Sequence, residues 1–158
     1  IPAQVIAAAH GAGPGWGLSG ALGGQNPPLE DYASSGARTV AKDLYAKAGI
    51  GPKDVDVAQF YDNFTPQVLM SIEDYGFCER GEGGSFVSDG HIRADGSLPI
   101  NTHGGHHSEA YIHGMNHIVE AVRQIRGTST TQIKGAEVCL VSGGPGIGPT
   151  SAALIGKC

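Results

Sequence analysis

Basic clusters, long apolar runs and an even set of cysteines are all missing from this 158-residue chain. Charged residues make up only 16% of the sequence and the formal net charge is -5, so no Lys/Arg cluster offers a surface for nucleic acid. No apolar run approaches the roughly 18 residues that a membrane span needs, and the first residues do not form a signal-like segment. We therefore expect neither a nucleic-acid partner nor a membrane span.

Three cysteines, Cys78, Cys139 and Cys158, are an odd number and lack metal-binding spacing. This pattern predicts a reducing, cytoplasmic compartment. The first residue is Ile rather than Met, so the chain is expected to begin within a longer protein or after processing. The hydrophobic content of 40% and the length predict one globular domain with a sizeable core.

Short apolar segments bounded by turn residues predict four strands, at residues 4–10, 55–61, 137–141 and 151–155. The last two are joined by a short glycine-rich turn, which favours antiparallel pairing. Residues 11–29 are expected to form a loop carrying Trp16, which could cover a bulky apolar ligand. Residues 81–98 are expected to be irregular and mobile, with hairpin turns at 89–90 and 95–96. Alternation with helices predicts an α/β fold in which helices cover a mixed sheet.

Three helices are expected between these strands. The first would be capped by the serines at 34–35. The second would start from the capping hydroxyl of Thr65, with Pro66 at the first helical position, where its missing N–H costs nothing. The third would cover residues 109–125, with Tyr111 on its apolar stripe.

Three segments carry the polar and glycine residues of interest, and their order is informative. Residues 61–64 read YDNF, residues 101–114 read NTHGGHHSEAYIHG, and residues 140–144 read LVSGG. This series resembles the carboxy-terminal half of a thiolase. There, Asn-Glu-Ala-Phe or His-Asp-x-Phe is followed by Asn-x-x-Gly-Gly with a catalytic His, and then by Leu-Cys-x-Gly-Gly-Gly.

The resemblance covers nearly the whole chain and implies a thiolase-like carboxy-terminal domain over residues 1–158, with a five-stranded mixed sheet covered by helices. It also implies that the amino-terminal half, which carries the nucleophilic Cys of true thiolases, is absent from this sequence. Thiolases usually dimerise through that half, so a homodimer core within the whole protein is expected.

Three acid/base positions depart from the thiolase pattern. Tyr111 stands where the catalytic His would be, and Tyr61 replaces the Asn or His of the first motif. Val141 fills the place of the carboxy-terminal Cys, with Cys139 two residues earlier. An imidazole with a pKa of about 6.5 can take a proton from a thiol near neutral pH, whereas a phenol with a pKa of about 10 does so poorly. Ordinary thiolysis is therefore not expected.

Two phenols facing one pocket suit a retro-aldol cleavage, because proton transfer works best between groups of similar pKa. The chain resembles the thiolase-like, lipid-transfer-protein-type aldolases of actinobacterial steroid side-chain degradation. The resemblance implies cleavage of a 17-hydroxy steroid acyl-CoA to a 17-ketosteroid and propionyl-CoA, with Tyr61 and Tyr111 as the acid/base residues. It further implies a small partner of OB-fold and zinc-ribbon type, and no cofactor apart from the CoA thioester of the substrate.

The remaining candidate site residues flank the tyrosines in the three motifs: Asp62, Asn63, Asn101, His103, Gly104, Gly105, His107, Gly143 and Gly144. Asp62 and Asn63 would either orient Tyr61 or cap the next helix. His103 and His107 would line the pocket or hydrogen-bond the tyrosines, while the other histidines pack or face solvent. Backbone N–H groups of the glycine pairs could hold the thioester oxygen.

Other readings of the same residues make different predictions. Five histidines between 103 and 117 suggest a metal site, but they lack the Glu of His-Glu-x-x-His and a clear third ligand, so no metal is expected. Residues 143–148 lack the Lys-Ser/Thr ending of a phosphate loop. Two alternative functions stay open: a sterol carrier protein x-type 3-oxoacyl-CoA thiolase, and a non-catalytic module that binds lipid or acyl-CoA.

Overall fold

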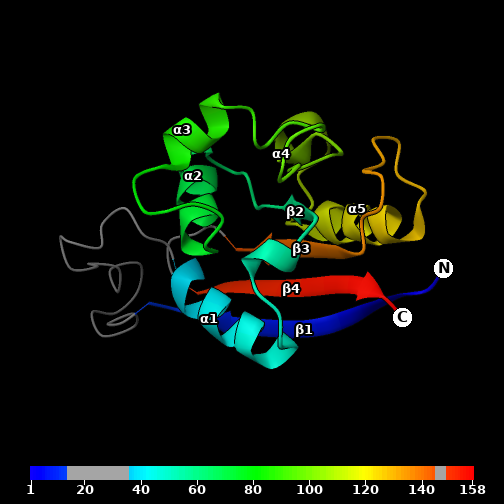
Figure 1. Cartoon of the computed structure of the whole chain (residues 1–158), viewed down its shortest axis with the longest axis horizontal. Coiled ribbons are helices and arrows are strands. Elements are labelled where there is room, and N and C mark those ends of the chain that lie inside the picture. The colour runs from blue at the N-terminus through cyan, green and yellow to red at the C-terminus, as the bar shows by residue number, and fades with distance from the viewer. Residues whose placement is uncertain (14–35, 145–148) are drawn as a thin grey trace.

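A mixed sheet forms the centre of the computed structural model, which describes residues 1–13, 36–144 and 149–158. Its strands are β1 (Ala3–Gly11), β2 (Val57–Gln59), β3 (Val138–Gly143) and β4 (Thr150–Lys157), in the order β1-β4-β3-β2 (Figure 1). β4 is antiparallel to both β1 and β3, and β2 is parallel to β3. The α/β class, the mixed sheet and the antiparallel pairing of the last two strands are thus confirmed.

The described part of the sheet has four strands, so the expected number of five was wrong. An isolated parallel bridge between Ala58 and Ile100 occupies the edge next to β2. Pro99 has no N–H to donate, and Asn101 takes a positive φ of 45°, so regular pairing cannot extend on either side. The chain leaves the sheet edge there and enters the glycine pair of the second motif.

Two helices lie on either side of β2 in the chain: α1 (Ala37–Ala48) and α2 (Thr65–Asp74). The serine caps predicted for α1 lie outside the described residues. For α2 the predicted cap was wrong, because the extended residue Phe64 occupies the N-cap position and Thr65 is already helical. No side chain caps α2, and Pro66 lies within its first two helical positions.

The segment predicted to be irregular contains a short helix, α3 (Gly83–Ser88). The Phe86 and Asp89 amides donate to the Glu82 and Ser85 carbonyls, and Gly90 follows with a φ of 85°. Turns do occur at 89–90 and 95–96, but no strand flanks them, so they are not hairpins. The predicted loop around Trp16 lies outside the described residues.

The third predicted helix is divided into α4 (Gly105–Ser108) and α5 (Met115–Arg126). His113 and Gly114 have φ values of 54° and 88°, and two successive left-handed residues cannot belong to an α-helix. Tyr111 therefore lies in the segment between the two helices, not on an apolar stripe of α5 as predicted.

The apolar stripe predicted for α5 is only partly buried. The buried residues of the helix are mostly polar, namely Asn116, His117, Glu120 and Gln124 together with Ala121 and Ile125. Met115, Ile118 and Val119 are 54%, 40% and 44% exposed. A helix that buries its polar side requires partners for those groups inside the fold.

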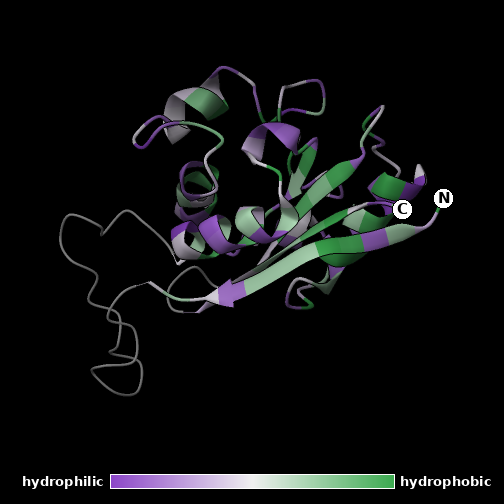
Figure 2. Cartoon of the chain, turned by 60° about the horizontal axis from the view of Figure 1, so that its bottom comes forward, coloured by the Kyte–Doolittle hydropathy of each residue, from purple (hydrophilic) through white to green (hydrophobic). Residues whose placement is uncertain are grey.

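Two hydrophobic clusters lie on opposite faces of the sheet, because neighbouring strand residues point to opposite sides. Ala58, Leu140 and Leu154 pack with Val40 and Leu44 of α1. The neighbouring strand residues, Val57, Cys139, Val141 and Ile155, pack with Ala121 and Ile125 of α5. α1 and α5 accordingly cover opposite faces of the sheet, and the strands between them are coloured mainly hydrophobic in Figure 2. Within the described residues, every helix is too short or too polar to cross a membrane.

Candidate active site

Tyr61 and Tyr111 meet at the end of β2, fifty positions apart in sequence. Their hydroxyl oxygens are 2.9 Å apart, and either can donate the hydrogen bond. The Tyr61 backbone N–H donates to Ser142 Oγ at 2.9 Å, which fixes the tyrosine against the end of β3. Tyr61 is 5% exposed and Tyr111 is 51% exposed. The pair therefore has a buried member and a member that faces the open side of the site.

Burial, together with the hydrogen bond and charge of Tyr111, raises the pKa of Tyr61 to about 12. Tyr61 is consequently a neutral phenol at physiological pH. Tyr61 can give up its proton only in a concerted step, in which a neighbouring group accepts that proton or supplies another one.

His106 and His113 lie nearest the tyrosines, and the His117 ring centroid is farther away, at 6.2 Å from that of Tyr61. The His106 ring centroid is 4.6 Å from those of both tyrosines. The His113 ring centroid is 5.0 Å from that of Tyr111, and its Nδ1 lies 3.4 Å from the Tyr61 hydroxyl oxygen. The sequence alone did not point to His106 and His113 as neighbours of the tyrosines, because their positions depend on backbone angles that a sequence does not show.

His103 and His107, the histidines expected to bond the tyrosines, lie elsewhere. The His103 Nε2 is 3.3 Å from Asn116 Nδ2 and 3.6 Å from Glu109 Oε2. His107 lies in α4 directly after the buried His106 and is exposed. The short turn of α4 points adjacent side chains in different directions, so only one of its two histidines faces Tyr61.

Asp62 anchors the second motif and does not cap α2. Its Oδ1 accepts the His106 backbone N–H at 3.0 Å and lies 3.5 Å from His117 Nε2. Burial opposes ionisation of Asp62, but the bonds from His117 and the His106 amide outweigh it and lower the pKa to about 2. A Cβ on Gly105 would lie 1.9 Å from Asp62 Oδ2, so only glycine allows this approach.

Asn101 fastens the same loop to the strand end. Its side-chain oxygen accepts the Phe60 N–H at 2.7 Å, and its Nδ2 donates to the Phe60 carbonyl at 3.1 Å. Gly104 follows with a φ of 97°, and a Cβ there would meet the Ser108 side chain. Asn63 keeps its side-chain oxygen buried, without a hydrogen-bond partner among the described residues. Asn101 and Gly104 thus shape the loop that carries His106 toward the tyrosines.

A cavity of about 520 Å³ opens beside the tyrosine pair. Its lining includes His113, Gly114, Ser142, Gly143 and Gly144 together with several small residues of β1 and β4, but neither tyrosine. Gly114 allows close contact with Tyr61, since a Cβ there would be 3.4 Å from its ring. Gly144 has a φ of 95° and its carbonyl accepts from Gln67 Nε2 at 3.3 Å. The cavity thus connects the glycine motif of β3 with the His113 side of the tyrosines.

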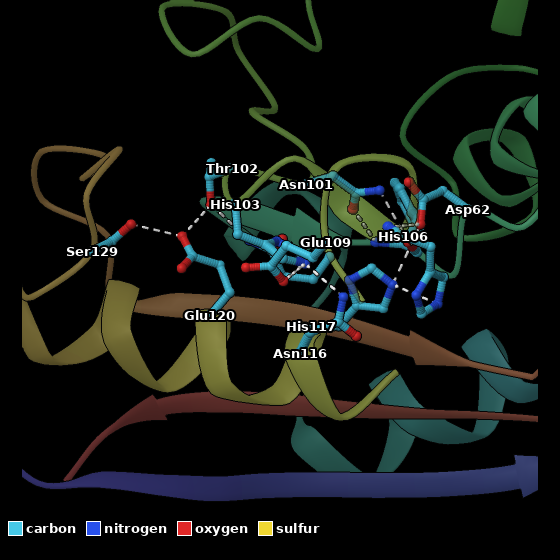
Figure 3. A network of polar contacts seen from close by, with 12 residues as sticks. Asp62, Asn101, Thr102, His103, His106, Glu109, Asn116, His117, Glu120 and Ser129 are labelled. Carbon is cyan, nitrogen blue, oxygen red and sulfur yellow. Dashed lines mark hydrogen bonds and ion pairs between the residues drawn. The ribbon is translucent and has the colours of Figure 1, made fainter. Parts of the chain in front are cut away.

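Asp62, His106 and His117 form a compact buried cluster whose possible ligand atoms lie within 4.8 Å of one another. His117 Nε2 is 3.2 Å from His106 Nε2 (Figure 3). Metal-binding histidines almost always donate their other ring N–H to an acceptor. Here Nδ1 of both histidines is buried without a partner among the described residues. The cluster therefore fits a hydrogen-bonded support for Tyr61 better than a metal centre.

A second polar network joins the second motif to the buried side of α5 (Figure 3). Glu120, 1% exposed, accepts hydrogen bonds from Thr102 Oγ1 at 2.5 Å and Ser129 Oγ at 2.7 Å. Gln124 Nε2 contacts the same carboxylate oxygen at 3.0 Å. Nothing in the residue pattern predicted this network, because a Glu on a helix normally faces solvent.

Comparison with known proteins identifies a family and several relatives that match this chain. Residues 26–157 match the family model described as thiolase C-terminal domain-like. The chain is 48% identical, over 82% of its length, to 17-hydroxy-3-oxo-4-pregnene-20-carboxyl-CoA lyase of Mycobacterium tuberculosis. It is 50% identical, over 74% of its length, to the steroid side-chain-cleaving aldolase of Thermomonospora curvata.

A solved structure named Ltp2-ChsH2(DUF35) aldolase superposes on 98% of the chain with a TM-score of 0.89 and 42% identity. The aligned regions cover 33% of the mycobacterial relative, 30% of the Thermomonospora relative and 39% of the chain in that structure. The chain thus spans about a third of the length of the relatives that it matches.

Proposed function

Because the chain belongs to the thiolase C-terminal domain-like family, we propose that it supplies the acid/base residues of a carbon–carbon lyase. The substrate would be a 17-hydroxy steroid acyl-CoA, cleaved to a 17-ketosteroid and propionyl-CoA. The observation that carries this proposal is the 2.9 Å contact between Tyr61 and Tyr111, the two residues that replace the thiolase acid/base groups.

The tyrosine pair suits a retro-aldol reaction, which removes one proton from oxygen and delivers one proton to carbon. A tyrosine takes the proton of the 17-hydroxyl while it passes its own phenolic proton to a hydrogen-bonded neighbour, as the adjacent carbon–carbon bond breaks and the steroid oxygen becomes a ketone. The electron pair of that bond passes to the thioester as an enolate, which a phenol then protonates at carbon. Both proton transfers involve groups of high pKa, for which Tyr61 and Tyr111 are better matched than an imidazole.

The thioester oxygen requires hydrogen-bond donors as its charge develops. Gly143 and Gly144 line the cavity together with small residues of β1 and β4, and backbone N–H groups near this turn are the candidates for that role. The only CoA involved in this mechanism is that of the substrate, and no further cofactor takes part. Asp62, His106 and Asn101 act by holding the loop that positions the tyrosines.

The whole protein is proposed to work in the cytoplasm as a homodimer core bound to a small protein of OB-fold and zinc-ribbon type. The similar solved structure carries a second protein, ChsH2(DUF35), in its name, which supports a heteromeric assembly. Free thiols at Cys78, Cys139 and Cys158 agree with a reducing compartment.

The test is product analysis with the whole protein and its small partner, using a 17-hydroxy steroid C22-acyl-CoA without free CoA. The expected products are propionyl-CoA and the 17-ketosteroid in equal amounts. CoA-dependent shortening of a 3-oxoacyl-CoA, without that cleavage, would instead assign the chain to a sterol carrier protein x-type thiolase. Tight binding of acyl-CoA without any turnover would assign it to a non-catalytic module.

A further inference from the structure

His113 is the one group besides Tyr111 whose polar atom lies within 3.5 Å of the Tyr61 hydroxyl among the described residues. Its Nδ1 is 3.4 Å from that oxygen, and its ring packs edge-on against the ring of Tyr111 at 5.0 Å. His113 also lines the cavity. Tyr111, Tyr61 and His113 thus form a continuous line of polar atoms, with the buried tyrosine in the middle.

The backbone at His113 is strained in a way that packing does not explain. Its φ of 54° lies in the left-handed region, which costs a non-glycine residue about 1–2 kcal/mol. The His113 side chain is exposed, so no buried contact offsets this cost. Glycine follows immediately at 114 and would have served at 113 had only the turn mattered. The conformation instead directs an imidazole toward Tyr61.

We infer that His113 is a proton-exchanging partner of Tyr61, completing a relay that runs from Tyr111 through Tyr61 to His113. This inference rests on the proposed lyase function. When Tyr111 accepts the hydroxyl proton of the substrate, its own proton passes to Tyr61, and the Tyr61 proton passes to His113 Nδ1. The electron pair of the broken carbon–carbon bond remains on the enolate. Reverse transfer returns one proton to the enolate carbon, so no net proton is gained or lost.

The relay explains how a buried phenol can participate at neutral pH. Burial disfavours a free Tyr61 phenolate, which is reflected in its raised pKa of about 12. If an imidazole accepts the proton as Tyr111 delivers another, Tyr61 never has to carry the full charge. His113 is a positioning and proton-exchanging residue in this scheme, since it acts on the substrate only through the two tyrosines.

Other titratable groups around His113 are few in the described part of the chain. Tyr61 and Tyr111 contact it directly, and His106 lies behind both of their rings. His10 and Lys47 border the same cavity. Because neither His10 nor Lys47 is within hydrogen-bonding range of Tyr61, a pH effect that disappears with His113 can be assigned to His113.

The experiment compares His113→Asn and His113→Gly in the whole protein with its partner, using propionyl-CoA release. Asparagine tolerates left-handed backbone and cannot titrate, whereas glycine leaves room for added imidazole. We expect kcat to fall by about 10²-fold in both variants, as for loss of a general base. Imidazole should restore activity to the Gly variant, and the acidic limb of the kcat/KM–pH profile should be absent from the Asn variant. His91→Asn, at a histidine that stacks on Phe86 and bonds Ser97, is the matched control and should behave as the unmodified protein.

Unchanged rates in both His113 variants would overturn the relay. A loss in both variants that imidazole does not reverse, with the acidic limb intact in the Asn variant, would overturn it as well, because it would show a structural role. Failure of the unmodified protein to release propionyl-CoA would instead contradict the proposed function. The two failures are therefore distinguishable in the same assay.

Discussion

At the residue scale, the two tyrosines differ mainly in burial, and we expect this difference to give them different roles. Tyr111, 51% exposed, can reach a substrate in the open side of the site, whereas Tyr61, 5% exposed, lies behind it. Substituting either tyrosine by phenylalanine removes only a hydroxyl and leaves the ring packing in place. Their loss should therefore affect catalysis far more than folding.

We expect Tyr61→Phe and Tyr111→Phe to lower kcat by on the order of 10²–10⁴-fold, the range associated with a single acid/base group. Steady-state release of propionyl-CoA by the whole protein measures this. Tyr45→Phe is the matched control, because the Tyr45 hydroxyl donates to the Tyr75 carbonyl away from the site. Full activity in both site variants, with unchanged melting temperature, would remove the tyrosines from the mechanism.

Asp62 makes a separate prediction about stability and pH. Its pKa is lowered from 3.8 to about 2 in the folded chain. The ionised form therefore contributes about 2 kcal/mol of stability above pH 4, and this contribution is lost as the pH falls from about 4 to 2. Melting temperatures of the whole protein across this interval should drop less steeply for Asp62→Asn. Parallel curves for the two proteins would contradict the assignment.

Much of the site could be predicted at this scale, but not its geometry. The resemblance of the YDNF motif and the glycine pair to thiolase motifs pointed to Tyr61, Tyr111 and the glycines, and the structure brings the two hydroxyls together. The involvement of His106 and His113 depends on φ angles at 113 and 114 and on the direction of one turn of α4. Such backbone detail follows from tertiary packing, which a single sequence does not reveal.

At the element scale, α5 shows where hydrophobic periodicity misleads. Its apolar residues Met115, Ile118 and Val119 face outward, and its polar residues face the sheet. Periodicity correctly indicated a helix near this position and the burial of Ile125, but it also predicted burial of Met115 and Ile118, which are exposed. The strands were predictable because Val57, Leu140 and their neighbours follow the simple alternation of a covered sheet.

The buried network around Glu120 predicts that replacing this glutamate lowers the stability of the fold, whereas replacing an exposed glutamate does not. Glu120→Leu would leave the hydroxyls of Thr102 and Ser129 without their acceptor inside the fold. We expect a loss of about 2–4 kcal/mol of stability, the range for breaking a buried charged network. Thermal or urea unfolding of the whole protein measures it.

The control for this experiment is Glu79→Leu, at an exposed position of the turn before α3. It introduces the same side chain without removing a buried acceptor, so its unfolding midpoint should not change. Equal effects of the two substitutions would show that the Glu120 network contributes no stability.

At the scale of the whole molecule, the chain presents an apolar face beside its site. Ile112, Met115, Ile118 and Val119 are each at least 40% exposed and follow one another along α5 and the segment before it. Exposed apolar area costs about 25 cal/mol per Å², so such a face is rarely left open to water. The fold class, sheet type and motif order were predictable for the whole molecule, but the position of this face on α5 was not, because it depends on which side of α5 the sheet covers.

The 158-residue chain produced by itself should bind a hydrophobic dye and self-associate. Replacing Met115, Ile118 and Val119 together by Gln should reduce both, because these side chains point away from the core. Dye fluorescence and light scattering at matched concentration measure the two effects. The same three changes made at the exposed Lys42, Glu79 and Lys134 provide a control that should leave both signals unchanged.

Cys139, in the middle of β3, makes it possible to measure how often the centre of the sheet opens. Its thiol is fully buried and burial raises its pKa, so an alkylating reagent, which attacks the thiolate, cannot modify it in the closed fold. Cys158 is exposed and should react at once. The delay between the two modifications, followed by mass spectrometry, would time how often the centre of the sheet opens. The buried Cys139 thiol thus reports the lifetime of the native state.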